Sequence, residues 1–86
     1  MNINQLIPIV KNKIEKNISL EYINIEDKTF LHKSHKTHQY GKFHLKLSIK
    51  LSEPEKMNKI QSTKKIYSIL DEELKKYIHS IQILII

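Results

Sequence analysis

The 86-residue chain contains no cysteine. Without a thiol it can form no disulfide bond, offers no thiolate ligand to a metal ion and has no cysteine nucleophile. The absence is compatible with a reducing compartment. The composition therefore excludes a disulfide-stapled scaffold and any metal site that the chain would build from its own thiolates.

Glycine occurs once, at Gly41, and arginine does not occur, so all 15 basic residues are lysine. A single glycine excludes glycine-rich phosphate-binding loops. Arginine is the side chain preferred for bidentate contacts with guanine and phosphate. The net charge of +6 and the pI near 9.6 are therefore discounted in part as signs of nucleic-acid binding.

Long apolar runs are also missing, since no segment approaches the roughly 18 residues that span a membrane. No signal-peptide pattern is visible at the N-terminus. The expectation is a cytoplasmic protein with no membrane partner. Residues 1–86 are predicted to form a single domain with a thin core, because so short a chain buries only about 60–65% of its unfolded surface.

Motifs of catalysis are absent as well. The chain shows no nucleophile elbow, glycine-rich phosphate loop or paired-carboxylate cleft. The protein is therefore not expected to be an enzyme.

The most informative stretch that is present runs from Asp27 to Leu51 and holds four of the five histidines. From Phe43 onward apolar and polar residues alternate strictly to Leu51, which predicts a strand with one buried face. The preceding segment, 27–41, is predicted to be a long polar loop. Long loops without structure of their own are often functional.

The rest of the chain alternates between helical and extended patterns. An amphipathic helix is predicted over Asn4–Asn17, capped by Asn4 and regular from about Ile7 because Pro8 suits only a first turn. Their content of β-branched residues predicts strands over Leu20–Glu26 and Ser80–Ile86. Between them, a capping signal at Ser52–Glu55 and helical periodicity predict a helix. This helix is expected to break near Asp71–Glu73 and to be followed by a short second helical turn.

This order, α-β-β-α-(α)-β, predicts an α+β two-layer sandwich with a three-stranded mixed sheet. All helices are expected on the side of Phe43, Leu45 and Leu47. The side of Lys46 and Lys50 is expected to be open.

The sequence resembles the BolA family over nearly its whole length, from about Ile7 to Ile85. The resemblance rests on motifs in matching order: Asp27-Lys28-Thr29-Phe30-Leu31-His32-Lys33-Ser34-His35 for Asp-x-Ser-x-x-His-x-Gly-His, Gly41-Lys42-Phe43-His44-Leu45 for Gly-x-Thr-His-Phe, then Glu73-Leu74 and Ile78-His79-Ser80-Ile81. The family's Arg-His-Arg segment falls on Ser62-Thr63-Lys64, and its Thr-Pro tail is absent.

The resemblance implies a fold like that of a type II KH domain and a non-enzymatic adaptor role in iron–sulfur cluster assembly and trafficking. Family members pair with monothiol glutaredoxins and share a 2Fe–2S cluster with them. Carried over, the ligands are His79 and one loop histidine, either His32 or His35. Histidine can replace thiolate on one iron of such a cluster. With no cysteine, the isolated chain is expected to hold no cluster.

Each histidine has a plainer interpretation. His79 follows a predicted helix end, where histidine often interacts with terminal carbonyls. His32 and His35 could be solvated loop residues, and His38, which has no family counterpart, is taken as solvated. The three-residue spacing of these loop histidines is a weak zinc signal. His44 is predicted to be a surface histidine on the open face.

The alternative function is DNA-binding transcriptional regulation through a lysine-rich surface that includes Lys59, Lys64 and Lys65. Recognition in the manner of KH domains is excluded, because it needs a Gly-x-x-Gly loop and the chain has only Gly41. A weak homodimer is a further option for the partner.

Overall fold

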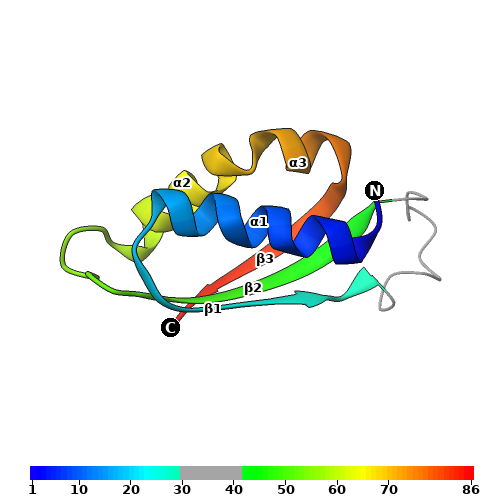
Figure 1. The fold of residues 1–86 in the computed structure, drawn as a ribbon. Coiled ribbons are helices and arrows are strands. Elements are labelled where there is room, and N and C mark those ends of the chain that lie inside the picture. The colour runs from blue at the N-terminus through cyan, green and yellow to red at the C-terminus, as the bar shows by residue number, and fades with distance from the viewer. Residues whose placement is uncertain (30–41) are drawn as a thin grey trace.

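The computed structural model describes residues 1–29 and 42–86. These residues form three helices on one side of a sheet (Figure 1). In chain order the elements are α1 (Ile3–Asn17), β1 (Leu20–Asp27), β2 (Phe43–Leu51), α2 (Lys59–Ile69), α3 (Asp71–Lys76) and β3 (Ile78–Ile85). This is the predicted α+β two-layer sandwich, and the short helix expected after the break near Asp71 is present as α3.

The sheet has the strand order β1-β2-β3. β1 pairs with β2 in antiparallel orientation, and β2 pairs with β3 in parallel orientation, so the sheet is mixed as predicted. Leu47 of β2 lies at the centre, opposite Ile25 on one side and Ile83 on the other. The parallel pairing requires a crossover, which α2 and α3 supply.

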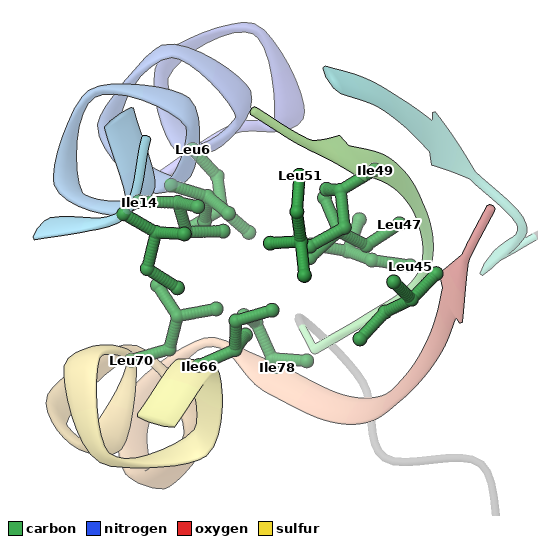
Figure 2. Packing of buried hydrophobic residues seen from close by; sticks show 12 residues of the cluster. Leu6, Ile14, Leu45, Leu47, Ile49, Leu51, Ile66, Leu70 and Ile78 are labelled. Atoms are coloured by element: carbon green, nitrogen blue, oxygen red, sulfur yellow. The ribbon is translucent and has the colours of Figure 1, made fainter. Parts of the chain in front are cut away.

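The core lies between the helices and the predicted apolar face of β2 (Figure 2). Along β2, Leu45, Leu47, Ile49 and Leu51 are buried. From the helices, the side chains that meet them include Leu6, Val10 and Ile14 of α1, Ile66 of α2 and Leu70 at the junction between α2 and α3. The spacing of the α1 residues by four places them on one face of that helix.

α1 begins earlier than predicted. Asn2, not Asn4, caps the helix: its Oδ1 accepts from the Gln5 backbone N–H at 2.9 Å, and Gln5 Oε1 accepts from the Asn2 N–H at 3.0 Å. This reciprocal pair satisfies the first turn, so the helix extends past Pro8 toward the N-terminus. Pro8 is exposed and lies inside the helix, not in its first turn as predicted from the sequence.

α2 begins later than predicted. Ser52–Glu55 forms exposed turns, and the capping residue is Asn58, whose Oδ1 accepts from the Gln61 N–H at 2.8 Å. This start turns Ile60 outward, where it is 69% exposed, and buries Ser62. The Ser62 hydroxyl donates to the Asn58 carbonyl at 2.8 Å, so its burial leaves no hydroxyl unsatisfied.

An ion pair joins α1 to α3. Lys13 Nζ donates to Glu73 Oε2 at 2.6 Å, and the Glu73 side chain is only 6% exposed. The hydrogen bond to Glu73 raises the pKa of Lys13.

Among the described helices, none is long and apolar enough to cross a membrane.

Candidate functional site

A shift in register between β2 and β3 shapes the end of the sheet where β3 begins. Phe43 lies opposite Ile78, but the next residue, His44, lies opposite Ser80. β3 therefore has one extra residue, His79, at this point. Such an irregularity redirects side chains locally. Ile78 stays in the core, while both His79 and Ser80 come next to His44.

His44 is buried, which corrects the prediction of a surface histidine. It lies on the face of β2 that also bears Lys46, yet it is only 5% exposed. Its Nδ1 lies 2.6 Å from the Ser80 Oγ, within hydrogen-bonding distance. Its ring centroid is 4.9 Å from that of His79, with the ring planes inclined at 58°. The neighbours that cover it come from elsewhere in the chain, and strand alternation alone does not reveal them.

A turn at the end of β1 holds the backbone of His44. The Asp27 carboxylate accepts from the backbone N–H of Thr29 at 3.0 Å, and also from its hydroxyl. The Thr29 Oγ1 in turn accepts from the His44 N–H at 3.1 Å, and the Lys28 N–H donates to the His44 carbonyl at 2.7 Å. An aspartate that bonds the backbone two residues on is a common turn former. Both backbone groups of His44 are thereby fixed.

His79 is the second residue of β3 and is exposed, so the strand begins two residues before the predicted start at Ser80. The strand start is anchored on both sides: the Phe43 N–H donates to the Tyr77 carbonyl at 2.9 Å, and the Tyr77 N–H donates to the Glu73 carbonyl at 2.8 Å. The His79 imidazole thus stands at the surface on a fixed strand end. Neutral imidazole in such a position can serve as a metal ligand.

An open depression of about 500 Å³ lies beside this end of the sheet. Lys28, His44, Lys46 and Ser80 are among the residues that line it. Lys28 is 3.8 Å from the Glu26 carboxylate, and Lys46 makes no ion pair with any residue of the ranges 1–29 and 42–86. The surroundings of the histidine pair therefore have a positive bias, which suits an anionic partner or group.

A family model described as BolA-like protein matches residues 14–86. The chain belongs to the BolA-like family. No curated protein sequence compared with the chain matches it significantly.

Solved BolA structures share the fold of this BolA-like chain. The BolA domain of SufE1 from Arabidopsis thaliana superposes with a TM-score of 0.74 at 21% identity, covering 99% of this chain and 92% of that one. BolA1 from Arabidopsis thaliana gives 0.71 at 24% identity, covering 91% and 86%. BolA1 from Mus musculus gives 0.67 at 21% identity, covering 90% of this chain and 60% of that one. These likenesses confirm the predicted fold.

The residues of the BolA-like motifs differ in their surroundings: some hold the fold together, and one is exposed at the surface. Asp27 and Thr29 form the turn that holds His44, so these two motif residues have a structural role here. Glu73 is the buried partner of Lys13. His79 is exposed. The loop ligands proposed from sequence, His32 and His35, lie outside the described residues, as does His38.

Among the described residues, one exposed imidazole, that of His79, is available as a candidate metal ligand. In the ranges 1–29 and 42–86, no three histidine or acidic side chains gather in a group that could hold a metal ion. His79 contributes one accessible nitrogen donor, and the sequence contains no thiolate. An iron–sulfur cluster bound at His79 would therefore need sulfur ligands from another protein.

The three lysines of the DNA-binding alternative are exposed on α2 but do not form one face. At 100° per residue, Lys64 lies roughly 140° around the helix axis from Lys59 in one direction and Lys65 roughly 120° in the other. None of the three makes an ion pair with a described residue. They form a dispersed positive surface, which favours weak phosphate contacts over a defined binding site.

Proposed function

We propose that this BolA-like protein is a non-enzymatic adaptor in iron–sulfur cluster assembly and trafficking in the cytoplasm. It pairs with a monothiol glutaredoxin, and the two proteins ligate a 2Fe–2S cluster between them. The ligands on this side are His79 and one loop histidine, His32 or His35. The isolated chain holds no cluster.

One observation carries the proposal: an exposed imidazole, that of His79, stands on an anchored strand end in a chain with no cysteine. Two histidines replace two thiolates on one iron in known 2Fe–2S centres. The remaining positions require sulfur, which the partner supplies. The choice of a monothiol glutaredoxin as this partner is supported by the resemblance of the sequence motifs to the BolA family.

Co-purification with a monothiol glutaredoxin, followed by visible absorption and circular dichroism, tests the proposal. The wild-type complex is expected to show the bands of a 2Fe–2S cluster. His79→Ala should abolish or reshape them, because it removes a ligand and leaves the fold intact at an exposed position. An unchanged cluster spectrum in His79→Ala would contradict the ligand assignment.

Separate loop variants identify the second ligand. Of His32→Ala and His35→Ala, one is expected to change the cluster spectrum as His79→Ala does and the other to leave it unchanged. His38→Ala is the matched control, since this histidine has no counterpart in the family motif. A spectrum that responds equally to all three loop variants would argue against a single loop ligand.

The alternative is a DNA-binding transcriptional regulator that uses Lys59, Lys64 and Lys65. Its support is the net charge of +6 and the exposure of these lysines on α2. Binding of this kind falls steeply with salt concentration. Absence of DNA binding even at low ionic strength would set the alternative aside.

A further inference from the structure

A second histidine is buried directly beside the proposed ligand, and the proposed function does not use it. His44 is 5% exposed, and its ring centroid lies 4.9 Å from that of His79. Burying an imidazole is unfavourable unless hydrogen bonds compensate for the loss of water. The position of His44 therefore calls for a physical role in the site.

We propose that His44 is a positioning residue for His79 and that Ser80 holds His44 in the orientation this requires. The His44 ring forms a wall against which the exposed His79 ring rests. The Ser80 hydroxyl fixes the orientation of the His44 ring, because its Oγ lies 2.6 Å from the His44 Nδ1. The consequence for cluster binding rests on the proposed function, whereas the ordering of the His79 ring holds for the isolated chain.

Three contacts make His44 a rigid support. The Lys28 N–H donates to its carbonyl and the Thr29 hydroxyl oxygen accepts from its N–H, so its backbone is held from the end of β1. Ser80 engages its ring from β3. His44 is thus held through its backbone by residues just after β1 and through its ring by β3, and all of these contacts lie within the chain.

The same contacts argue that His44 supports a ligand and is not one itself. Its Nδ1 is engaged with Ser80, and its ring is covered. His79 has the opposite properties, being exposed and in contact with the wall through one ring face or edge. Side chains that orient a metal ligand in this way usually affect metal affinity strongly without touching the metal.

The register shift is the feature that brings the three side chains together. Because His79 is the extra residue between two paired positions, Ser80 takes the place opposite His44 while His79 stays within ring contact. A regular ladder would place His79 itself opposite His44 and turn Ser80 toward the core. The shift therefore gives His44 one neighbour that holds it and one that it orients.

The test compares Ser80→Ala, Ser80→Thr and His44→Ala. In the isolated chain, NMR measures ring-to-ring nuclear Overhauser effects between His44 and His79 and the order of the His79 ring. Wild type and Ser80→Thr, which retains the hydroxyl, are expected to show an ordered His79 ring. Ser80→Ala and His44→Ala should loosen it. Gln82→Ala, an exposed change on the same face of β3, is the control and should leave it unchanged.

The second readout is the rate at which a chelator removes the cluster from the glutaredoxin complex. Ser80→Ala is expected to accelerate loss by about 10–100-fold, and Ser80→Thr to restore the wild-type rate. An equally ordered His79 ring in wild type and Ser80→Ala overturns the positioning role, whatever the cluster does. A loosened ring with an unchanged rate of loss overturns its importance for ligation.

The two proposals fail in different ways. If the wild-type complex carries no cluster, the proposed function fails, and the NMR comparison still decides whether His44 orders His79. If His44→Ala does not fold, the Ser80 variants alone give the answer, because they leave the His44 ring in place.

Discussion

On the face of the sheet that the helices cover, every second residue of β2 from Leu45 to Leu51 is buried, whereas on the opposite face Lys46 and Ser48 are half-buried and Lys50 is exposed. The covered face follows one rule, since its buried apolar residues all belong to one core cluster with side chains of the helices (Figure 2). On the opposite face, the polar side chains stay at least partly exposed except at the end of the strand that bears His44. There His44 is buried, although the described helices α1, α2 and α3 lie on the other side of the sheet.

The difference between the two faces lies in what causes burial. The core face is buried by layers that the apolar pattern itself brings together. Among the described residues, the neighbours of His44 include Thr29, whose hydroxyl oxygen accepts from its N–H, the hydroxyl of Ser80 and the ring of His79. The core is therefore sensitive to lost volume, and the histidine end is sensitive to lost hydrogen bonds.

The largest expected effect is on the core face. Leu47→Ala removes a fully buried side chain at the centre of the sheet and should lower the free energy of unfolding by about 2–5 kcal/mol. Lys50→Ala, on the opposite face of the same strand, is the matched control and should change it by less than about 0.5 kcal/mol. Urea unfolding measures both. Similar losses in the two variants would remove the distinction between the faces.

The core face shows what the sequence can predict. The period-two pattern placed β2 at Phe43–Leu51, the bounds that the structure has, and put the helices on the correct side. Such patterns are reliable because a one-residue slip would move every apolar side chain into water. Mistakes arose at helix starts, where two capping signals competed and the side-chain pair of Asn58 and Gln61 prevailed over Ser52–Glu55.

The candidate site was predicted in part. His79 came from the family motif, and the structure shows it exposed at a strand end. The burial of His44 was missed because its neighbours are distant in the sequence, and no local signal in β2 or β3 encodes the register shift that pairs it with Ser80. The motif residues Asp27 and Thr29 were the available clue, since Thr29 holds His44. The assignment of His32 or His35 stays a prediction.

The second effect tests the hydrogen bonds that cover His44. Thr29→Val keeps the shape of the side chain but removes the oxygen that accepts from the His44 N–H and the hydroxyl that donates to Asp27. Leaving a covered N–H without its acceptor should cost about 1–3 kcal/mol. Urea unfolding measures the loss, and hydrogen exchange of the His44 amide should accelerate.

The control for this variant is Ser48→Ala. Ser48 is half-buried on the same face of the sheet, and its hydroxyl makes no hydrogen bond with a described residue. Its loss should change stability by less than about 0.5 kcal/mol. If Ser48→Ala cost as much as Thr29→Val, hydrogen bonding would not be what distinguishes the histidine end from the rest of that face.

The smallest effect concerns charges on the helical layer and depends on pH. The hydrogen bond from Lys76, 3.1 Å from Glu72, lowers the pKa of Glu72 below its ordinary value of 4.5, and the positive charge of Lys13 adds to this. A carboxyl group whose pKa is lower in the folded state stabilises the fold above its unfolded pKa. This contribution is lost as the pH falls through the lowered folded value.

Glu72→Gln should therefore be slightly less stable than wild type at pH 7, and the two should converge well below pH 4.5. Thermal unfolding at both pH values measures the difference, which should be small because both partners are exposed to solvent and screened by salt. Glu55→Gln, at an exposed turn with no ion pair among the described residues, should match wild type at pH 7. A loss in Glu72→Gln as large as that in Leu47→Ala would mean that charge, not apolar burial, secures the helices to the sheet.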